Sequence, residues 1–122
     1  FQLLEPQMNI KIIQNKIREF CEKRDWDQFH NPKNIAASIA IESSELLQIF
    51  QWSKGISWDE LEDEKLKKEV EEELADILIY LIRFSDLSNI DLEKSINKKL
   101  IKNENNYPIS KSKGSDIKYN KL

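Results

Sequence analysis

Two pairs of carboxylates, each spaced three residues apart, are the residues of this sequence best suited to chemistry. The first pair is Glu42 and Glu45, and the second is Glu73 and Asp76. Residues three apart on an α-helix lie on one side of it, so each pair presents two oxygen donors in the same direction. Mg²⁺ binds carboxylate oxygens and keeps positions for water and phosphate. The spacing therefore predicts a Mg²⁺ site built from all four acids.

The place of these acids on their helices strengthens the metal interpretation. With about 100° between successive residues, Glu42 falls inside an apolar stripe and Glu45 lies at the edge of that stripe. Glu73 likewise falls inside the apolar stripe of the next long helix, with Asp76 beside it. Buried carboxylates are costly when unpaired, and four that converge repel one another. A divalent cation would remove that conflict.

Other interpretations of the acidic residues are weaker. Glu-x-x-Glu pairs are common on solvated helices, but here an acidic pair occurs on two adjacent helices, each time among apolar residues. A carboxylate-bridged diiron bundle needs two Glu-x-x-His motifs, and the one histidine, His30, lies outside the expected helices. Zinc prefers nitrogen and sulfur ligands. Glu69 could add an oxygen to the same face, whereas Glu71 and Glu72 are assigned to solvent.

The composition is that of one modest domain. The chain has 122 residues and a net charge of -3, which gives no basic field for nucleic acid and no cationic helix for a membrane surface. No apolar run approaches the roughly 20 residues that span a bilayer. A single cysteine, Cys21, excludes an intrachain disulfide, and we expect it in the core or at its boundary. These features favour a cytoplasmic protein.

Long helices must position the acids, because few residues break the chain. Only two glycines and three prolines occur, and no alternating run of β-branched residues indicates a sheet. We expect an all-α four-helix bundle whose narrow core is completed by oligomerisation. Apolar spacing predicts helices at about residues 7–24, 33–52, 61–87 and 92–103.

Capping residues and the tail complete the expected organisation. Ser57 or Asp59 can cap the third helix, and Asp91 can cap the fourth. We expect a single catalytic domain over residues 1–108. The lysine-rich tail, residues 109–122, is expected to be ordered only by contacts with something else.

The acids stand in a longer pattern that resembles the MazG-like, all-α NTP pyrophosphatase superfamily, and most closely its dCTP pyrophosphatase branch. The similarity extends from the first helix through Tyr119. The acidic pairs alone are moderately specific. The match becomes much stronger with the Trp-x-x-Phe-His loop of residues 26–30 and the Phe-Gln-Trp sequence of residues 50–52.

The resemblance implies hydrolysis of a nucleoside triphosphate to the monophosphate and pyrophosphate, a housecleaning activity on the nucleotide pool with dCTP as the preferred substrate. It also implies Mg²⁺ and a homodimer or homotetramer in which neighbouring subunits complete the sites. All four acidic positions are kept, which favours a working enzyme. The alternative is a non-catalytic module that binds nucleotides or oligomerises on an inherited acidic scaffold.

Four aromatic side chains are candidates for binding the base by stacking and edge hydrogen bonds: Trp26, His30, Trp52 and Tyr80. Trp26 could instead close the bundle as an apolar plug together with Phe29.

Lys99 and Asn103, one turn apart on the fourth helix, could contact phosphate oxygens, although two solvated positions on an exposed face are equally consistent with the sequence. Any of the glutamates could serve as the general base. Trp58 is assigned to packing.

Overall fold

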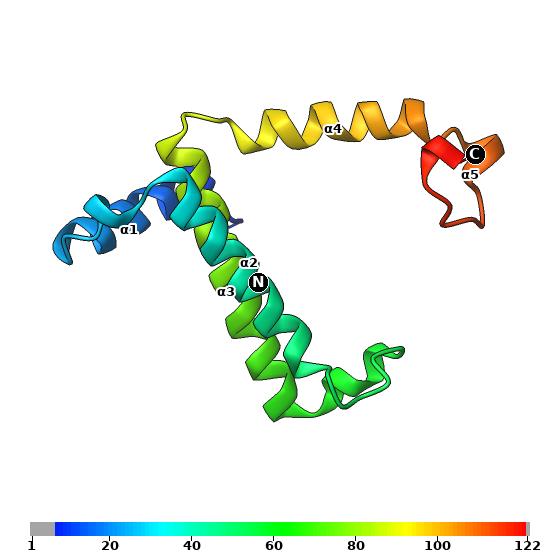
Figure 1. Cartoon of the computed structure of the whole chain (residues 1–122), viewed down its shortest axis with the longest axis horizontal. Coiled ribbons are helices and arrows are strands. Elements are labelled where there is room, and N and C mark those ends of the chain that lie inside the picture. The colour runs from blue at the N-terminus through cyan, green and yellow to red at the C-terminus, as the bar shows by residue number, and fades with distance from the viewer. Residues whose placement is uncertain (1–6, 122) are drawn as a thin grey trace, which may run out of the picture. The chain divides into compact units, whose positions relative to one another are not determined.

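The computed structural model describes residues 7–121, and within that range the regular secondary structure is all helical, as predicted (Figure 1). No strand occurs among these residues. None of their helices is both long and apolar enough to cross a bilayer. The expected tail ends at Leu122, which lies outside the described residues. The α-helices are α1 (Ile10–Lys23), α2 (Pro32–Ile49), α3 (Glu64–Leu87), α4 (Leu92–Asn106) and α5 (Ile109–Ser112).

Helix α1 begins at Ile10, three residues later than predicted. The Asn9 side chain accepts hydrogen bonds from the backbone nitrogens of Lys11 and Ile12, at 3.0 and 3.3 Å. Asparagine is more favourable as a cap than inside a helix, because its side chain competes for backbone donors. The helix packs against α3 and buries Ile17 and Cys21.

Helix α2 begins at Pro32 and ends at Ile49, so its predicted range was shifted at both ends. Proline is favoured at the first helical position because its fixed φ suits the helix and its missing N–H is not needed there. The chain then turns at Phe50, and the positive φ of 62° at Gly55 redirects it further. Trp52, the last residue of the predicted helix, therefore lies beyond the end of α2.

Helix α3 starts at Glu64 rather than at residue 61, and its cap is neither of the two expected residues. Asp63 accepts hydrogen bonds from the backbone nitrogens of the second and third helical residues, at 3.0 and 3.2 Å. Ser57 instead caps a separate 3₁₀ turn, Trp58–Glu62, by accepting a hydrogen bond from the Asp59 nitrogen at 3.2 Å.

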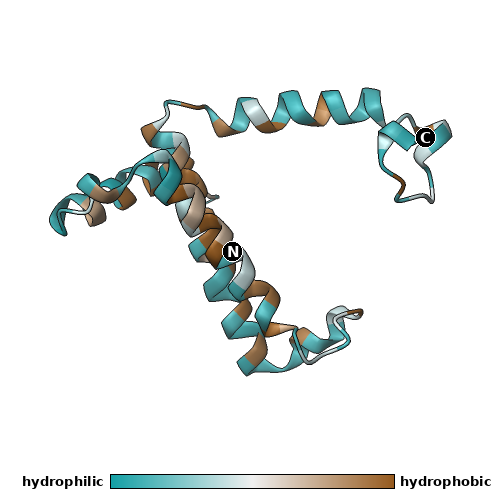
Figure 2. Ribbon diagram, viewed as in Figure 1, coloured by the Kyte–Doolittle hydropathy of each residue, from teal (hydrophilic) through white to brown (hydrophobic). Residues whose placement is uncertain are grey.

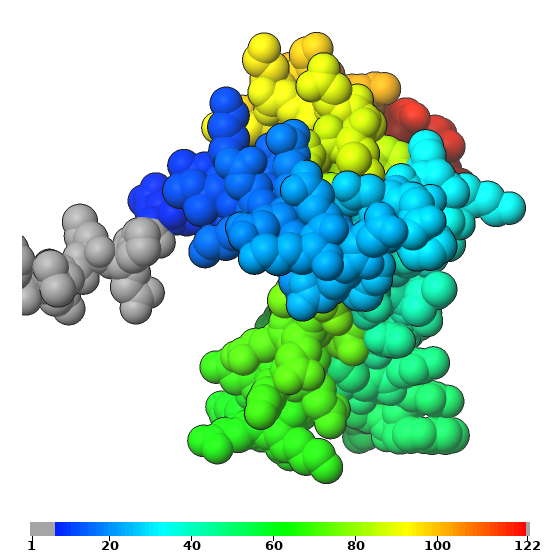
Figure 3. Space-filling view, turned by 90° about the vertical axis from the view of Figure 1, so that its left-hand side faces the viewer, coloured from blue at the N-terminus to red at the C-terminus, as the bar shows by residue number. Residues whose placement is uncertain are grey.

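The chain divides into two compact units at Ser88 and Asn89. In the first unit α2 and α3 lie side by side along their length, and α1 packs on α3. Figure 3 shows α1 and the loop after it, in blue, lying across one end of the pair. Five side chains form the buried apolar core of the described residues: Ile17, Cys21, Ile35, Val70 and Ile82.

The second unit consists of α4 and the tail. Asp91 caps α4 as predicted, by accepting a hydrogen bond from the Lys94 nitrogen at 3.0 Å. The tail forms α5 and a final 3₁₀ turn, and the rings of Tyr107 and Tyr119 meet edge to face at 5.8 Å. This aromatic contact brings the tail back to the end of α4; that the tail is ordered only by contacts with something else stays a prediction.

Candidate active site

The acidic residues of α2 and α3 face one another across the helix pair. Carboxylate oxygens of Glu42, Glu73 and Asp76 all lie within 4.8 Å of one another. Glu42 and Glu73 are half-buried and Asp76 is exposed, which agrees with their expected places inside the apolar stripes and at an edge. The helix pairing thus brings together acids that are 31 or more positions apart in sequence.

Two oxygens in this group lack any partner among the described residues. They are the Oε2 atoms of Glu42 and Glu73, both of them buried. Burial, with contacts to Glu73 and Glu45 adding to it, raises the pKa of Glu42 to about 7. Burial likewise raises the pKa of Glu73, and the charges of Glu45 and Asp76 add to that effect. A site of oxygen donors with surplus negative charge fits Mg²⁺.

Glu45 borders this group. Its oxygens are not among those that lie within 4.8 Å of one another, but its half-buried side chain follows Glu42 by one turn. Its charge is one of the causes that raise the pKa values of both Glu42 and Glu73. Glu45 therefore contributes to the same negative field.

A cavity of about 480 Å³ lies beside the acids, between α1, α3 and the loop that joins α1 to α2. Trp26, His30 and Tyr80, three of the four residues expected to bind the base, line this cavity. Asp76 lines it as well, so the cavity adjoins the acidic group. Its volume falls in the range of small-molecule sites, and most of its wall is apolar, as a site for an aromatic base requires.

The remaining tryptophans lie elsewhere. Trp52 is 91% exposed and does not line the cavity, because α2 ends three residues before it. Trp58, which was assigned to packing, is 86% exposed. Phe29 is also exposed, whereas the Trp26 ring meets Phe20 edge to face at 5.6 Å. Phe29 therefore does not close the bundle of the described residues as an apolar plug.

The two residues expected to contact phosphate lie on α4, in the second unit. Lys99 is exposed and Asn103 is half-buried one turn later.

Sequence reasoning missed Arg83 of α3, a buried residue with only 3% of its surface exposed. Its Nε donates a hydrogen bond to His30 Nδ1 at 3.1 Å, and its Nη2 donates one to Asp27 Oδ1 at 2.6 Å. Arg83 follows Asp76 by seven residues, about 20° away on a helical wheel. This spacing from Asp76 was the sequence signal that could have placed Arg83 on the same face of the helix.

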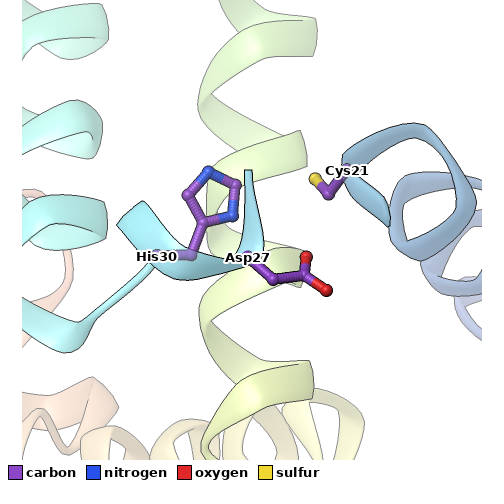
Figure 4. A group of neighbouring side chains, drawn as sticks. All are labelled: Cys21, Asp27 and His30. Atoms are coloured by element: carbon purple, nitrogen blue, oxygen red, sulfur yellow. The ribbon is translucent and has the colours of Figure 1, made fainter. Parts of the chain in front are cut away.

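Cys21, Asp27 and His30 form a second cluster of groups that could hold a metal (Figure 4). The side chains of Asp27 and His30 come from the loop, and Cys21 faces them from α1. Arg83 already occupies one acceptor atom on each of the two loop residues. Burial also raises the pKa of the Cys21 thiol, which disfavours the thiolate that a metal needs. The Arg83 guanidinium therefore occupies the position that a metal ion would need in this cluster.

Known proteins are similar to this chain in sequence and in fold. The model of the MazG-like family matches residues 37–122, a range that includes all four acids. Rat dCTP pyrophosphatase 1 is 34% identical over 96% of this chain and 69% of its own length. Human dCTP pyrophosphatase 1 is 31% identical over the same shares of the two chains.

A solved structure agrees with these sequence matches. The crystal structure of a pyrophosphatase from Archaeoglobus fulgidus has a TM-score of 0.74 and 41% sequence identity, covering 88% of this chain and 99% of that one. The chain belongs to the MazG-like family, in its dCTP pyrophosphatase branch.

Proposed function

We propose that this chain converts dCTP, or a closely similar nucleotide, to the monophosphate and pyrophosphate, using Mg²⁺ held by Glu42, Glu45, Glu73 and Asp76. The broader activity, that of a nucleoside triphosphate diphosphatase, follows from the family and from the named activities of the relatives. The preferred base, the metal and the roles of single residues are the parts that we propose. A place in the cytoplasm, with the nucleotide pool, is part of the same proposal.

One observation carries the proposal: three carboxylates from two helices converge within 4.8 Å, and two of their buried oxygens have no partner in the described part of the chain. Such a group is unfavourable by itself, because like charges are held together in a partly dry place. A bound Mg²⁺ would offset the negative charge of the triphosphate and lower the pKa of an attacking water. The acids would supply the oxygen ligands that hold this positive ion next to the cavity.

The adjoining cavity supplies a place for the base. Asp76 lines the cavity and belongs to the acidic group, so a nucleotide whose base enters the cavity has its phosphates near the acids. Trp26 and Tyr80 offer aromatic surfaces, and His30 offers a hydrogen-bonding edge. Lys99 and Asn103 are proposed to contact phosphate oxygens.

An exposed apolar surface on α2 and α3 supports a homodimer or homotetramer. Leu47, Leu74 and Leu78 are 72%, 53% and 39% exposed, and Figure 2 shows apolar residues in brown along the outside of this helix pair. A second copy of the chain would cover such a surface. Light scattering after size exclusion tests this, and a Leu78→Glu variant should shift the protein toward the monomer.

A substrate panel tests the activity. Purified protein is incubated with each ribo- and deoxyribonucleoside triphosphate, with and without Mg²⁺, and monophosphate and pyrophosphate are measured. We expect dCTP to be hydrolysed fastest, and only with the metal. Glu73→Gln should abolish turnover, whereas Glu72→Gln, a change at the exposed neighbouring residue, should leave turnover near the wild-type rate.

Three outcomes would contradict parts of the proposal. Absence of products from every nucleotide with Mg²⁺ present would leave a non-catalytic module. Orthophosphate and diphosphate as products would refute the position of attack. Full turnover by Glu73→Gln would refute the metal assignment.

A further inference from the structure

Arg83 constrains the chemistry of His30. The guanidinium Nε donates to His30 Nδ1 at 3.1 Å, and Nη2 donates to Asp27 Oδ1 at 2.6 Å. An arginine side chain stays protonated and has donors only. His30 Nδ1 must therefore carry a lone pair directed at Arg83.

This contact determines where the imidazole proton lies. A neutral imidazole has one N–H, so a ring that accepts at Nδ1 carries its proton on Nε2. A charged imidazolium would have a proton on both nitrogens and could not accept from Arg83. Burial, and then the charge of Arg83, lower the pKa of His30, while Asp27 opposes them. His30 is thus a neutral ring whose one polar hydrogen is on Nε2.

His30 and Arg83 both line the 480 Å³ cavity. In a wall that is mostly apolar, a donor held in a fixed position discriminates among ligands, because a buried N–H without an acceptor is unfavourable. We propose that Arg83 is a positioning residue that holds His30 as the Nε2–H tautomer, so that the cavity offers a fixed hydrogen-bond donor to an acceptor on the edge of the nucleobase. This inference rests on the proposed function, which places the base in this cavity.

Nitrogen NMR tests the first half of the inference without any catalysis. The chain contains one histidine, so protein labelled with ¹⁵N-histidine gives one pair of ring signals. We expect the wild type at neutral pH to show a pyrrole-type Nε2 and a pyridine-type Nδ1. Arg83→Met removes both donors, and its signals should move toward the average of two exchanging tautomers. Arg18→Met is the matched control, because it also removes an arginine contact to α3 (Arg18 to Asp86) but should leave the ring signals unchanged.

Kinetics test the second half. With dCTP, Arg83→Met should raise KM by about 2- to 10-fold, the loss expected for one hydrogen bond, and change kcat little. With an abasic deoxyribose 5′-triphosphate the KM of the two proteins should be equal, because no base is present to accept the bond. A purely structural defect would affect both substrates alike. Arg83→Lys, which keeps a charge and a donor, should recover part of the loss.

Each result decides the proposal. A wild-type spectrum with the proton on Nδ1, or with a charged ring, would overturn it, and this holds even if Arg83→Met fails to fold. An unchanged tautomer in folded Arg83→Met, or an equal KM increase with both substrates, would overturn it too. Expected spectra together with no hydrolysis of any nucleotide would instead refute the proposed function alone.

Discussion

Arg18 of α1 binds Asp86 of α3 through two parallel hydrogen bonds, Nε to Oδ2 at 2.6 Å and Nη2 to Oδ1. The Asp86 side chain is only 3% exposed, whereas that of Arg18 is 52% exposed. The pair joins two helices that both line the cavity. Removal of Arg18 therefore leaves a buried carboxylate, whereas removal of Asp86 leaves an exposed guanidinium.

That difference predicts an asymmetric response to mutation. Arg18→Met leaves a buried carboxylate without a partner, which is costly, whereas Asp86→Asn leaves an arginine that can reach water. We expect Arg18→Met to lower Tm by about 5–10 °C and Asp86→Asn to lower it less. The double variant should be more stable than Arg18→Met alone. Equal Tm losses for the two single variants in thermal unfolding would contradict this prediction.

The same pair predicts a loss of stability in acid. The hydrogen bonds from Arg18 are the largest cause that lowers the pKa of Asp86 below 3.8. In the unfolded chain this carboxyl takes up a proton near its ordinary pKa, while in the folded chain it stays charged. The stabilisation from the pair is therefore complete above about pH 4 and declines as pH falls through the folded pKa. Urea unfolding between pH 2 and 5 should show a steeper decline for the wild type than for Asp86→Asn.

The acidic group predicts a conflict between stability and activity. Glu42→Gln removes a negative charge from a place where burial and neighbouring acids raise the pKa of that carboxyl to about 7. We expect Glu42→Gln to have a higher Tm than the wild type in EDTA and activity reduced about 100-fold or more. Mg²⁺ should raise the Tm of the wild type but not that of the variant. Glu71→Gln, at an exposed position, is the control. A Glu42→Gln protein that is still stabilised by Mg²⁺ as strongly as the wild type would contradict the assignment.

The proposed contact of Lys99 with phosphate makes a separate prediction. Lys99→Met should raise KM for dCTP by about 10-fold or more, as expected when one charge-assisted hydrogen bond is lost. The control is Lys98→Met, a change of equal charge at the adjacent exposed position, about 100° around the helix. Equal KM values for the two variants would assign Lys99 to a solvated surface.

The site was predictable wherever the helical period continued unbroken. The wheel placed Glu42 and Glu73 inside apolar stripes, and the structure brings their oxygens together with those of Asp76. The predicted helix extended to Trp52, whereas α2 ends at Ile49, because apolar spacing does not mark where a helix stops. Helix ends depend on which polar residue caps the helix. Asp63 and Asn9 cap α3 and α1, but several nearby polar residues could have done so, and the sequence alone does not select among them.

Arg83 was missed for a different reason. Arginines usually lie at the surface, and its burial follows from contact with Asp27 and His30, more than 50 positions earlier in the chain. No local pattern reports a pairing over that separation. The contact between Tyr107 and Tyr119 was not foreseen either, since it depends on a turn that composition does not reveal.

The reactivity of the Cys21 thiol can report on the state of the cavity wall. The thiol is 4% exposed, and burial raises its pKa, so little thiolate is available to react while α1 stays on α3. Because Cys21 also lines the cavity, alkylation of this sole sulfhydryl requires the reagent to enter the cavity or α1 to lift away. The rate of labelling thus measures how accessible the cavity wall is, on intact protein and without any introduced probe.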